Sequence, residues 1–131
     1  MRPDVVAEVE RQHRLLANWL GTSAQPDVLE ALDAAHTSDF SMVTAEGRSV
    51  GRQALLDALA GASNARPGLR ILIGGVREVA DLGEALLVEF LETHVDHGHT
   101  AARRVTALLQ IAEEAPHGLR WRHVHETPVA E

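Results

Sequence analysis

The sequence contains no cysteine, no lysine and no tyrosine, and its only aromatic residues are two tryptophans and two phenylalanines. Without cysteine there is no disulfide, no thiolate nucleophile and no zinc-thiolate site, and without lysine there is no Schiff-base chemistry. Without tyrosine, no phenol can act as an acid or as an oxyanion donor. Any catalysis must therefore use His, Asp, Glu, Arg, Ser, Thr, Asn, Gln or Trp, or a metal held by His and carboxylates.

Basic charge and long apolar runs are also scarce. The 12 basic residues are all arginines, spread along the chain, and the formal net charge is -7. Nucleic acid is therefore excluded as a partner, because phosphate binding needs a basic face. No apolar run approaches the roughly 18 residues of a membrane span, and the N-terminal stretch MRPDVVAEVERQHRLL carries charges throughout, unlike a signal peptide. We expect a cytoplasmic protein with no membrane partner.

The order of elements predicts one domain over residues 1–131, long enough to bury a core. Apolar residues at spacings of three and four predict a first helix over 3–20, and Asp27 is expected to cap a short second helix. A short hairpin turns at AEG, and GRQALLDALAGA is typical of a third helix. From Leu69 onward the pattern predicts four long strands, with a bulge or bend at Gly74-Gly75 and a tight hairpin at His97-Gly98.

This order predicts an α+β fold in which N-terminal helices pack on one face of a strongly curved antiparallel sheet. The long strands are apolar on both faces, as in ALLVEFL. A sheet with only one covered face would alternate between apolar and polar residues. We therefore expect a second copy of the chain to cover the other face, which predicts a homodimer.

A family resemblance is carried by HRLLANWLG, by DFSMVTAEGRSVGRQALLDAL, by the four closing strands and by WRHVHET. Through these stretches the chain resembles the nuclear-transport-factor-2-like (NTF2-like) superfamily, the cone-shaped α+β fold of ketosteroid isomerases and polyketide cyclases. It is most similar to uncharacterised bacterial single-domain members, a branch that is also similar to the association domain of calmodulin-dependent kinases. The resemblance implies a pocket and a dimer. It implies no reaction, because the fold hosts unrelated activities and the pocket tyrosines of the isomerases and of scytalone dehydratases are absent.

Strict alternation along the last strand predicts which side chains face the helices. Trp121, His123 and His125 fall on one side, and Arg122 and Glu126 fall on the other. Arginine tolerates water better than a buried site does, so we expect the side with the tryptophan and the imidazoles to face the cavity.

The polar residues expected at this cavity suit acid–base chemistry, because a histidine near a carboxylate can serve as a general base at neutral pH. An arginine among them could hold an anionic substrate group. The catalytic candidates are His123, His125 and Glu92, and the substrate-binding candidates are His13, His94, Arg104 and Trp121. The alternative is that these side chains only satisfy one another's hydrogen bonds inside a sheet.

Metal binding is the other chemistry that these residue types allow. THVDHGH and HVHE both offer histidines and carboxylates close together, but neither spacing matches a strong zinc signature. We expect no metal and no cofactor. A chelator should therefore leave the melting temperature unchanged, and a drop of more than a few degrees would revive the metal interpretation.

Two functions remain open from the sequence. The first is a small-molecule-binding protein or cofactor-independent enzyme of lyase, isomerase or cyclase type, acting on a small apolar or carboxylated ligand. The second is a non-catalytic association or accessory domain that acts through dimerisation. A cavity filled by Trp19, Phe90 and Trp121 would favour the second function.

Overall fold

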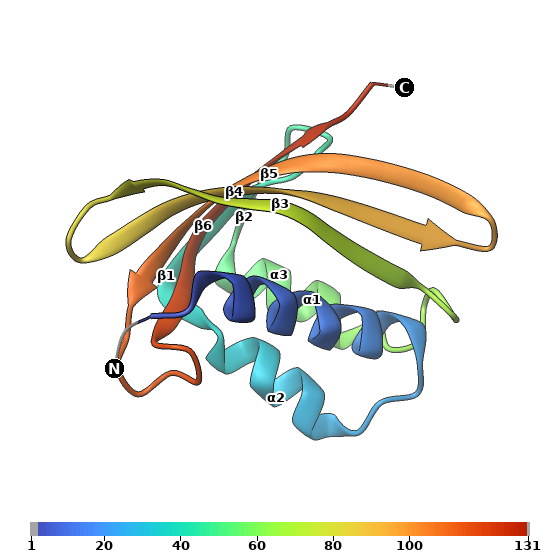
Figure 1. The fold of residues 1–131 in the computed structure, drawn as a ribbon. Coiled ribbons are helices and arrows are strands. Elements are labelled where there is room, and N and C mark those ends of the chain that lie inside the picture. The colour runs from blue at the N-terminus through green and yellow to red at the C-terminus, as the bar shows by residue number, and fades with distance from the viewer. Residues whose placement is uncertain (1–2, 131) are drawn as a thin grey trace.

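The computed structural model describes residues 3–130, which form three helices and a six-stranded sheet (Figure 1). The helices are α1 (Val5–Gly21), α2 (Pro26–Ala34) and α3 (Arg52–Ala60). The strands are β1 (His36–Val43), β2 (Ser49–Gly51), β3 (Arg70–Asp81), β4 (Ala85–Asp96), β5 (His99–Ile111) and β6 (Leu119–Pro128). Among the described residues, no helix has the length and apolar character needed to cross a membrane.

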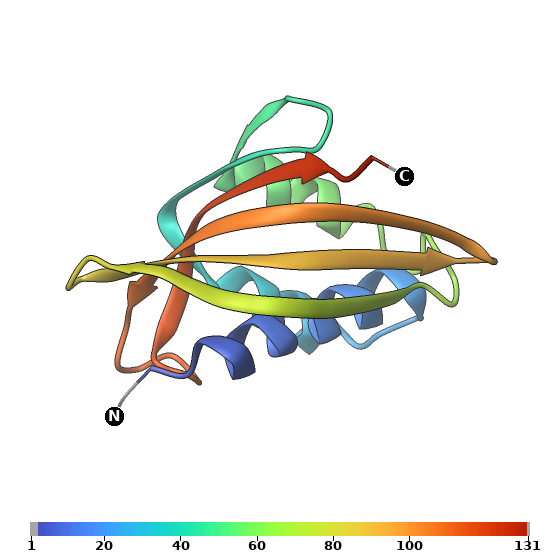
Figure 2. The ribbon, with the colours of Figure 1, turned by 45° about the horizontal axis from the view of Figure 1, so that its top comes forward.

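The strands lie in the order β2-β1-β6-β5-β4-β3, and all the helices lie on one side of the curved sheet (Figures 1 and 2). This confirms the expected α+β fold. The sheet differs from the expectation in one respect, because β1 and β6 run parallel while the other neighbours run antiparallel. Hydrophobic periodicity indicates that a segment is a strand but does not specify its partner or direction.

Helix α1 carries polar side chains into the interior of the fold. Asp4 caps its N-terminus by accepting a hydrogen bond from the backbone N–H three residues later, at 3.0 Å. The buried side of the helix includes Val9 and also Glu8, Gln12 and His13. Residues at these spacings share one helix face. The stripe that anchors α1 to the sheet therefore also brings three polar groups inside.

The helix ends reflect local backbone constraints. Helix α1 ends at Gly21, where a Cβ atom would lie 3.0 Å from the backbone nitrogen of Leu69. Glycine thus allows the chain before β3 to pack closely against the end of the helix. Helix α2 begins at Pro26 with Gln25 at the N-cap, so the prediction that Asp27 caps it is wrong. Asp27 lies in the first turn, where the helix dipole favours a carboxylate.

Both irregularities that the sequence predicts in the long strands are confirmed. The register of β3 on β4 shifts between Gly74 and Arg77, and Gly75 has a φ of 61°. His97 and Gly98 have φ values of 49° and 81° between β4 and β5, as the central residues of a two-residue hairpin turn do.

Strand β6 contains a bulge that alternation along the sequence does not reveal. Its register with β5 shifts between Trp121 and His123, so Arg122 is an extra residue. One extra residue moves every later side chain to the opposite face. Trp121 faces the helices, but His123 and His125 lie on the outer face of the sheet and Glu126 turns inward. The prediction that Trp121 and both histidines share the inner face is therefore wrong for the histidines.

The hydrophobic core has two parts. Between the sheet and α1, Phe90, Val105 and Trp121 are at most 2% exposed. Between the helices, Trp19 packs with two leucines, and its Nε1 donates a hydrogen bond of 2.6 Å to the carbonyl of Leu59. Trp19 is thus held among the helices, away from the inner face of the sheet.

Candidate functional site

A small cavity lies between the inner face of the sheet and the helices, with a volume of about 100 Å³. Its apolar lining consists of Leu16, Phe40, Met42, Leu55, Phe90, Val105, Trp121 and Val124. Its polar lining consists of Gln12, His13, His36, Glu92 and Glu126. An apolar lining with a few polar groups is typical of small-molecule sites, and at about 100 Å³ this cavity is smaller than the roughly 300–1,000 Å³ of most of them. Phe90 and Trp121 form walls of this cavity and do not fill it.

Three of the predicted site residues form a hydrogen-bonded chain at the cavity. Glu92 Oε1 lies 3.0 Å from His13 Nε2, and Glu92 Oε2 lies 2.5 Å from His94 Nε2. All three side chains are buried. Glu92 and His94 are two residues apart on β4, so both point to the inner face, and His13 reaches them from the buried face of α1.

Hydrogen-bond geometry assigns the protons in this chain. His13 Nδ1 donates to the carbonyl of Val9 at 2.7 Å, so Nε2 needs a second proton to donate to an ionised Glu92. His94 Nδ1 accepts from Arg66 Nη1 at 3.0 Å, so its single proton lies on Nε2, facing Glu92. Glu92 is thus placed to accept hydrogen bonds from two imidazoles, one on α1 and one on β4.

Glu92 is ionised at neutral pH. Burial raises the pKa of its carboxyl group, but the hydrogen bonds and charges of His13 and His94 together outweigh burial and hold the pKa well below its usual range. A carboxylate held in this way is a weak base. Its position suits it to orient His13 and to set the charge of the site.

Glu126 is the second carboxylate of the cavity, and its pKa moves in the opposite direction. Burial raises the pKa of this carboxyl group and the negative charge of Glu92 raises it further, while Arg103 Nη1, 3.4 Å from Oε1, offsets this only in part. Paired carboxyl groups whose pKa values are pushed apart are typical of acid–base sites. Sequence alternation missed Glu126 because the β6 bulge reverses its face.

Gln12 and His36 form another polar group of the cavity. His36 Nδ1 donates to the carbonyl of Leu32 at 2.6 Å, so its Nε2 accepts from Gln12 Nε2 at 3.4 Å. Burial lowers the pKa of His36, which agrees with a neutral ring. Gln12 is 4% exposed, and its Oε1 has no hydrogen-bond partner within residues 3–130. The sequence could have indicated Gln12 as a site residue, because it is a polar residue next to His13 in an otherwise apolar helical stripe.

Trp121, a predicted substrate-binding residue, forms one wall of the cavity. Its Nε1 donates a hydrogen bond of 2.8 Å to Glu8 Oε2, and His117 Nδ1 lies 3.1 Å from Glu8 Oε1. The ring centroid of His13 lies 6.0 Å from that of the indole, edge-on. The indole N–H is thus committed to Glu8, and Trp121 contributes shape and support for His13.

Three other predicted site residues lie on the outer face of the sheet. Arg104 is exposed, whereas its neighbour Arg103 points inward and pairs with Glu126. His123 Nδ1 lies 2.9 Å from Ser41 Oγ on β1, and His125 is exposed. The expectation that Arg104, His123 and His125 line the cavity is therefore wrong. For the histidines the reason is the bulge, and for Arg104 it is the register of β5.

Within residues 3–130, no group of three or more His, Asp or Glu side chains is arranged to hold a metal ion. The histidines of THVDHGH are separated, because His94 is buried while His97 and His99 are exposed at the hairpin. His125 and Glu126 of HVHE lie on opposite faces of the sheet. Metal independence stays a prediction for the chelator experiment.

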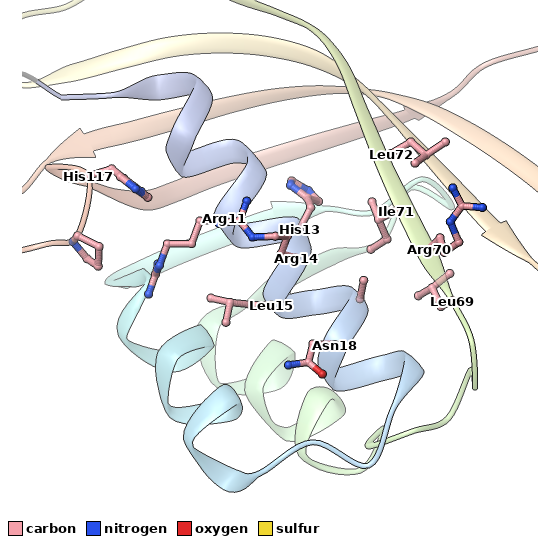
Figure 3. Close-up of a pocket in the computed structure, with 12 residues that line it drawn as sticks. Arg11, His13, Arg14, Leu15, Asn18, Leu69, Arg70, Ile71, Leu72 and His117 are labelled. Atoms are coloured by element: carbon pink, nitrogen blue, oxygen red, sulfur yellow. The ribbon is translucent and has the colours of Figure 1, made fainter.

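A wider, open groove of about 850 Å³ runs between α1 and the start of β3 (Figure 3). Arg11 and Arg70 lie on opposite sides of it, and their guanidinium groups point away from each other. These two charges therefore do not converge on one ligand. His13 lines both the groove and the cavity, and its partner Glu92 lines the cavity.

The fold and the cavity define this chain as a cone-shaped α+β protein with an internal pocket. It is similar to the crystal structure of an NTF2-like protein of unknown function from Pseudomonas aeruginosa. The two share 31% sequence identity and a TM-score of 0.88, over 95% of this chain and 98% of that one. The chain belongs to the NTF2-like family.

More distant structures share the fold. The hub of CaMKII from S. rosetta has 12% identity and a TM-score of 0.72, over 95% of this chain and 94% of that one. A candidate scytalone dehydratase from Novosphingobium aromaticivorans has 11% identity and a TM-score of 0.71, over 96% and 82%. Comparison of the sequence with protein-family models and with curated proteins gave no match.

Proposed function

We propose that this NTF2-like protein binds a small molecule in the cone cavity and handles it by acid–base chemistry without a cofactor. The observation that carries the proposal is the cavity itself, in which the buried Glu92 and the part-buried Glu126, with opposite pKa shifts, face an apolar space. Related folds include a candidate scytalone dehydratase, which supports an enzyme-like use of the cone.

Glu126 is the group best placed to move a proton, because a raised pKa brings its carboxyl group closer to neutral pH. The His13–Glu92 pair supplies a fixed imidazole and a carboxylate beside it. None of the described residues that line the cavity carries a hydroxyl or a thiol. The groups present therefore favour proton transfer of the lyase, isomerase or cyclase kind over a covalent intermediate.

Occupancy of the cavity can be tested with xenon, which enters apolar cavities in proteins. We expect xenon to shift the NMR signal of the Trp121 indole N–H and to leave that of Trp19 unchanged. Leu55→Phe, which places a larger ring against the cavity, should abolish the shift, whereas Leu82→Phe should not, because Leu82 is 61% exposed. Equal shifts in both variants, or no shift in the wild type, would count against the proposal.

The same fold supports a second role, association of two chains through the outer face of the sheet. Leu87, Leu91 and Leu108 are only half-buried there, and Leu72 on β3 is 47% exposed. Apolar patches of this kind mark interaction surfaces. Neighbours in fold include the CaMKII hub of S. rosetta and a candidate calmodulin-dependent kinase association domain from Thiobacillus denitrificans, which favours oligomerisation. We propose a homodimer, and both roles can coexist because they use opposite faces.

Light scattering at micromolar concentration should give twice the mass of one chain. Leu108→Glu places a charge in the middle of the outer face and should give the monomer mass. Leu82→Glu, in the turn after β3, should leave the dimer intact. A wild-type mass equal to one chain would contradict the homodimer. The single-domain organisation and the cytoplasmic location also stay predictions.

A further inference from the structure

The donor nitrogens that line the cavity already have acceptors within the protein. His13 donates to Val9 and Glu92. His36 Nδ1 donates to a backbone carbonyl, and the indole nitrogen of Trp121 donates to Glu8. Gln12 Nε2 donates to His36 Nε2. Among these groups, only the second N–H of the Gln12 amide has no acceptor, so a ligand meets few free side-chain donors.

Most of the available polar atoms of the cavity are acceptors. Gln12 Oε1 is buried and has no partner among the described residues. The assignment of this Gln12 atom as oxygen follows from His36. The ring proton of His36 lies on Nδ1, so its Nε2 is an acceptor. Only the NH₂ group of Gln12 can donate to it, which leaves the amide oxygen on the other side. Glu126 has two oxygens with about four acceptor sites. Arg103, at the long distance of 3.4 Å, and the backbone N–H of Ala45 use only part of that capacity.

The charge and shape of the cavity lining further restrict which ligands can bind. Among the described residues, no arginine lines the cavity, and Arg104 lies on the outer face. A carboxylated ligand would therefore meet Glu92 and Glu126 without a free cation. The rings of Phe90 and Trp121 also lie at the cavity, and aromatic faces attract cations.

We propose that the ligand of this cavity is a small primary amine bound as its ammonium ion, which donates hydrogen bonds to the Glu126 carboxylate and to Gln12 Oε1. The inference rests on the proposed function, since it assumes that the cavity takes a ligand. An ammonium group supplies several donors and a further positive charge for the Glu126 carboxylate, which Arg103 approaches only to 3.4 Å. Its alkyl part packs against the apolar lining.

The volume limits the size of this amine. A cavity of roughly 150 Å³ holds benzene, so 100 Å³ takes on the order of four or five non-hydrogen atoms. Isobutane, isopropanol, isopropylammonium and acetate form a matched set of this size, since each has one central carbon with three substituents. They differ in charge and in the capacity to donate hydrogen bonds.

The four probes can be titrated into the full-length protein at neutral pH, with the Trp121 indole N–H signal as the readout. We expect isopropylammonium to bind about tenfold more tightly than isopropanol, since hydrogen bonds to charged groups are the stronger ones. Acetate should not bind. Glu126→Gln should remove the preference for the amine, and Gln12→Leu should reduce it. Glu113→Gln removes an exposed carboxylate elsewhere and should change nothing.

Binding of the amine should also depend on pH. Its affinity should fall as the pH drops through the raised pKa of Glu126, because the protonated carboxyl group carries no charge to pair with the ammonium ion. The charged and titratable groups around Glu126 are Arg103 on β5, Glu92 and His94 on β4, and, through Glu92, His13 on α1. The affinity of isopropanol should change much less over the same range.

The outcomes separate this inference from the proposed function. If isopropanol or isobutane binds as well as the amine, or if acetate binds best, the amine assignment is overturned and the pocket stands. If none of the four probes shifts the Trp121 signal, both proposals fail, because the cavity takes no ligand of the size that it can hold. If Glu126→Gln does not fold, the ranking of the probes and its pH dependence in the wild type still decide the question.

Discussion

Replacing Glu92 by glutamine should lower the free energy of unfolding at neutral pH by about 3–5 kcal/mol, the usual cost of removing one partner from a buried ion pair. The Glu92 side chain is 6% exposed and lies 3.0 Å from His13 and 2.5 Å from His94. Glutamine keeps the size but offers one acceptor oxygen, so one of the two imidazoles loses its acceptor and the site loses the negative charge of the carboxylate. Urea denaturation followed by circular dichroism measures the change.

The matched control is Glu114→Gln. Glu114 lies 2.7 Å from Arg120, but the two side chains are 66% and 35% exposed. Water screens an exposed pair, so this change should cost at most about 1 kcal/mol. If Glu92→Gln costs no more than Glu114→Gln, the buried ion pair is not a main source of stability.

The contribution of Glu92 should vary with pH in one direction. Its folded pKa lies below the unfolded value of 4.5, so the folded state favours the ionised carboxylate. The stabilisation is therefore complete above about pH 4.5 and declines as the pH falls through the folded pKa. The difference in unfolding free energy between the wild type and Glu92→Gln should shrink from neutral pH to about pH 3. A difference that grew in acid would contradict the assignment.

Trp121→Ala should have the other large effect. Trp121 is 2% exposed, and its ring centroid lies 6.3 Å from that of Phe90. Truncation to alanine should cost about 3–5 kcal/mol for the lost ring. It should cost about 1.5–3 kcal/mol more because Glu8 loses a hydrogen-bond donor. The total is comparable to the whole stability of a domain, about 5–15 kcal/mol. We expect this variant to be largely unfolded, as judged by loss of NMR chemical-shift dispersion.

Trp121→Phe separates the two parts of this cost. Phenylalanine keeps an aromatic ring in the core but has no N–H group for Glu8. We expect a folded protein whose loss of stability is about 1.5–3 kcal/mol from the hydrogen bond, with a smaller packing loss added. A phenylalanine variant as unstable as the alanine variant would show that the hydrogen bond, and not the ring, dominates.

Residues of the candidate site could be predicted from the sequence where a single helix or strand determines the face on which a residue lies. His13 lies in the apolar stripe of α1, and Glu92 and His94 share one face of β4, so helical and strand periods predict which residues lie together on a face. The sequence predicts that these residues share a cavity but does not predict that they touch, because the distance between α1 and β4 depends on how the helix packs. Gln12 was within reach of the same argument, as a polar neighbour of His13.

The assignments on the last strand failed for a different reason. Alternation put Trp121, His123 and His125 together and put Glu126 outside. The extra residue Arg122 reverses the face after Trp121. A bulge depends on hydrogen bonding between two strands, and nothing in the stretch RWRHVHET itself indicates one.

The sequence by itself determined the class of fold, the order of helices and strands, the glycine bulge at Gly74-Gly75 and the hairpin at His97-Gly98. Each of these follows from local properties: side-chain period, backbone freedom and turn geometry. Only the tertiary structure decided that β1 and β6 run parallel, that Glu126 faces the cavity and that Arg103 rather than Arg104 reaches it. These depend on strand register, which is set by pairing between segments far apart in the chain and which moves a side chain to the other face with each single-residue shift.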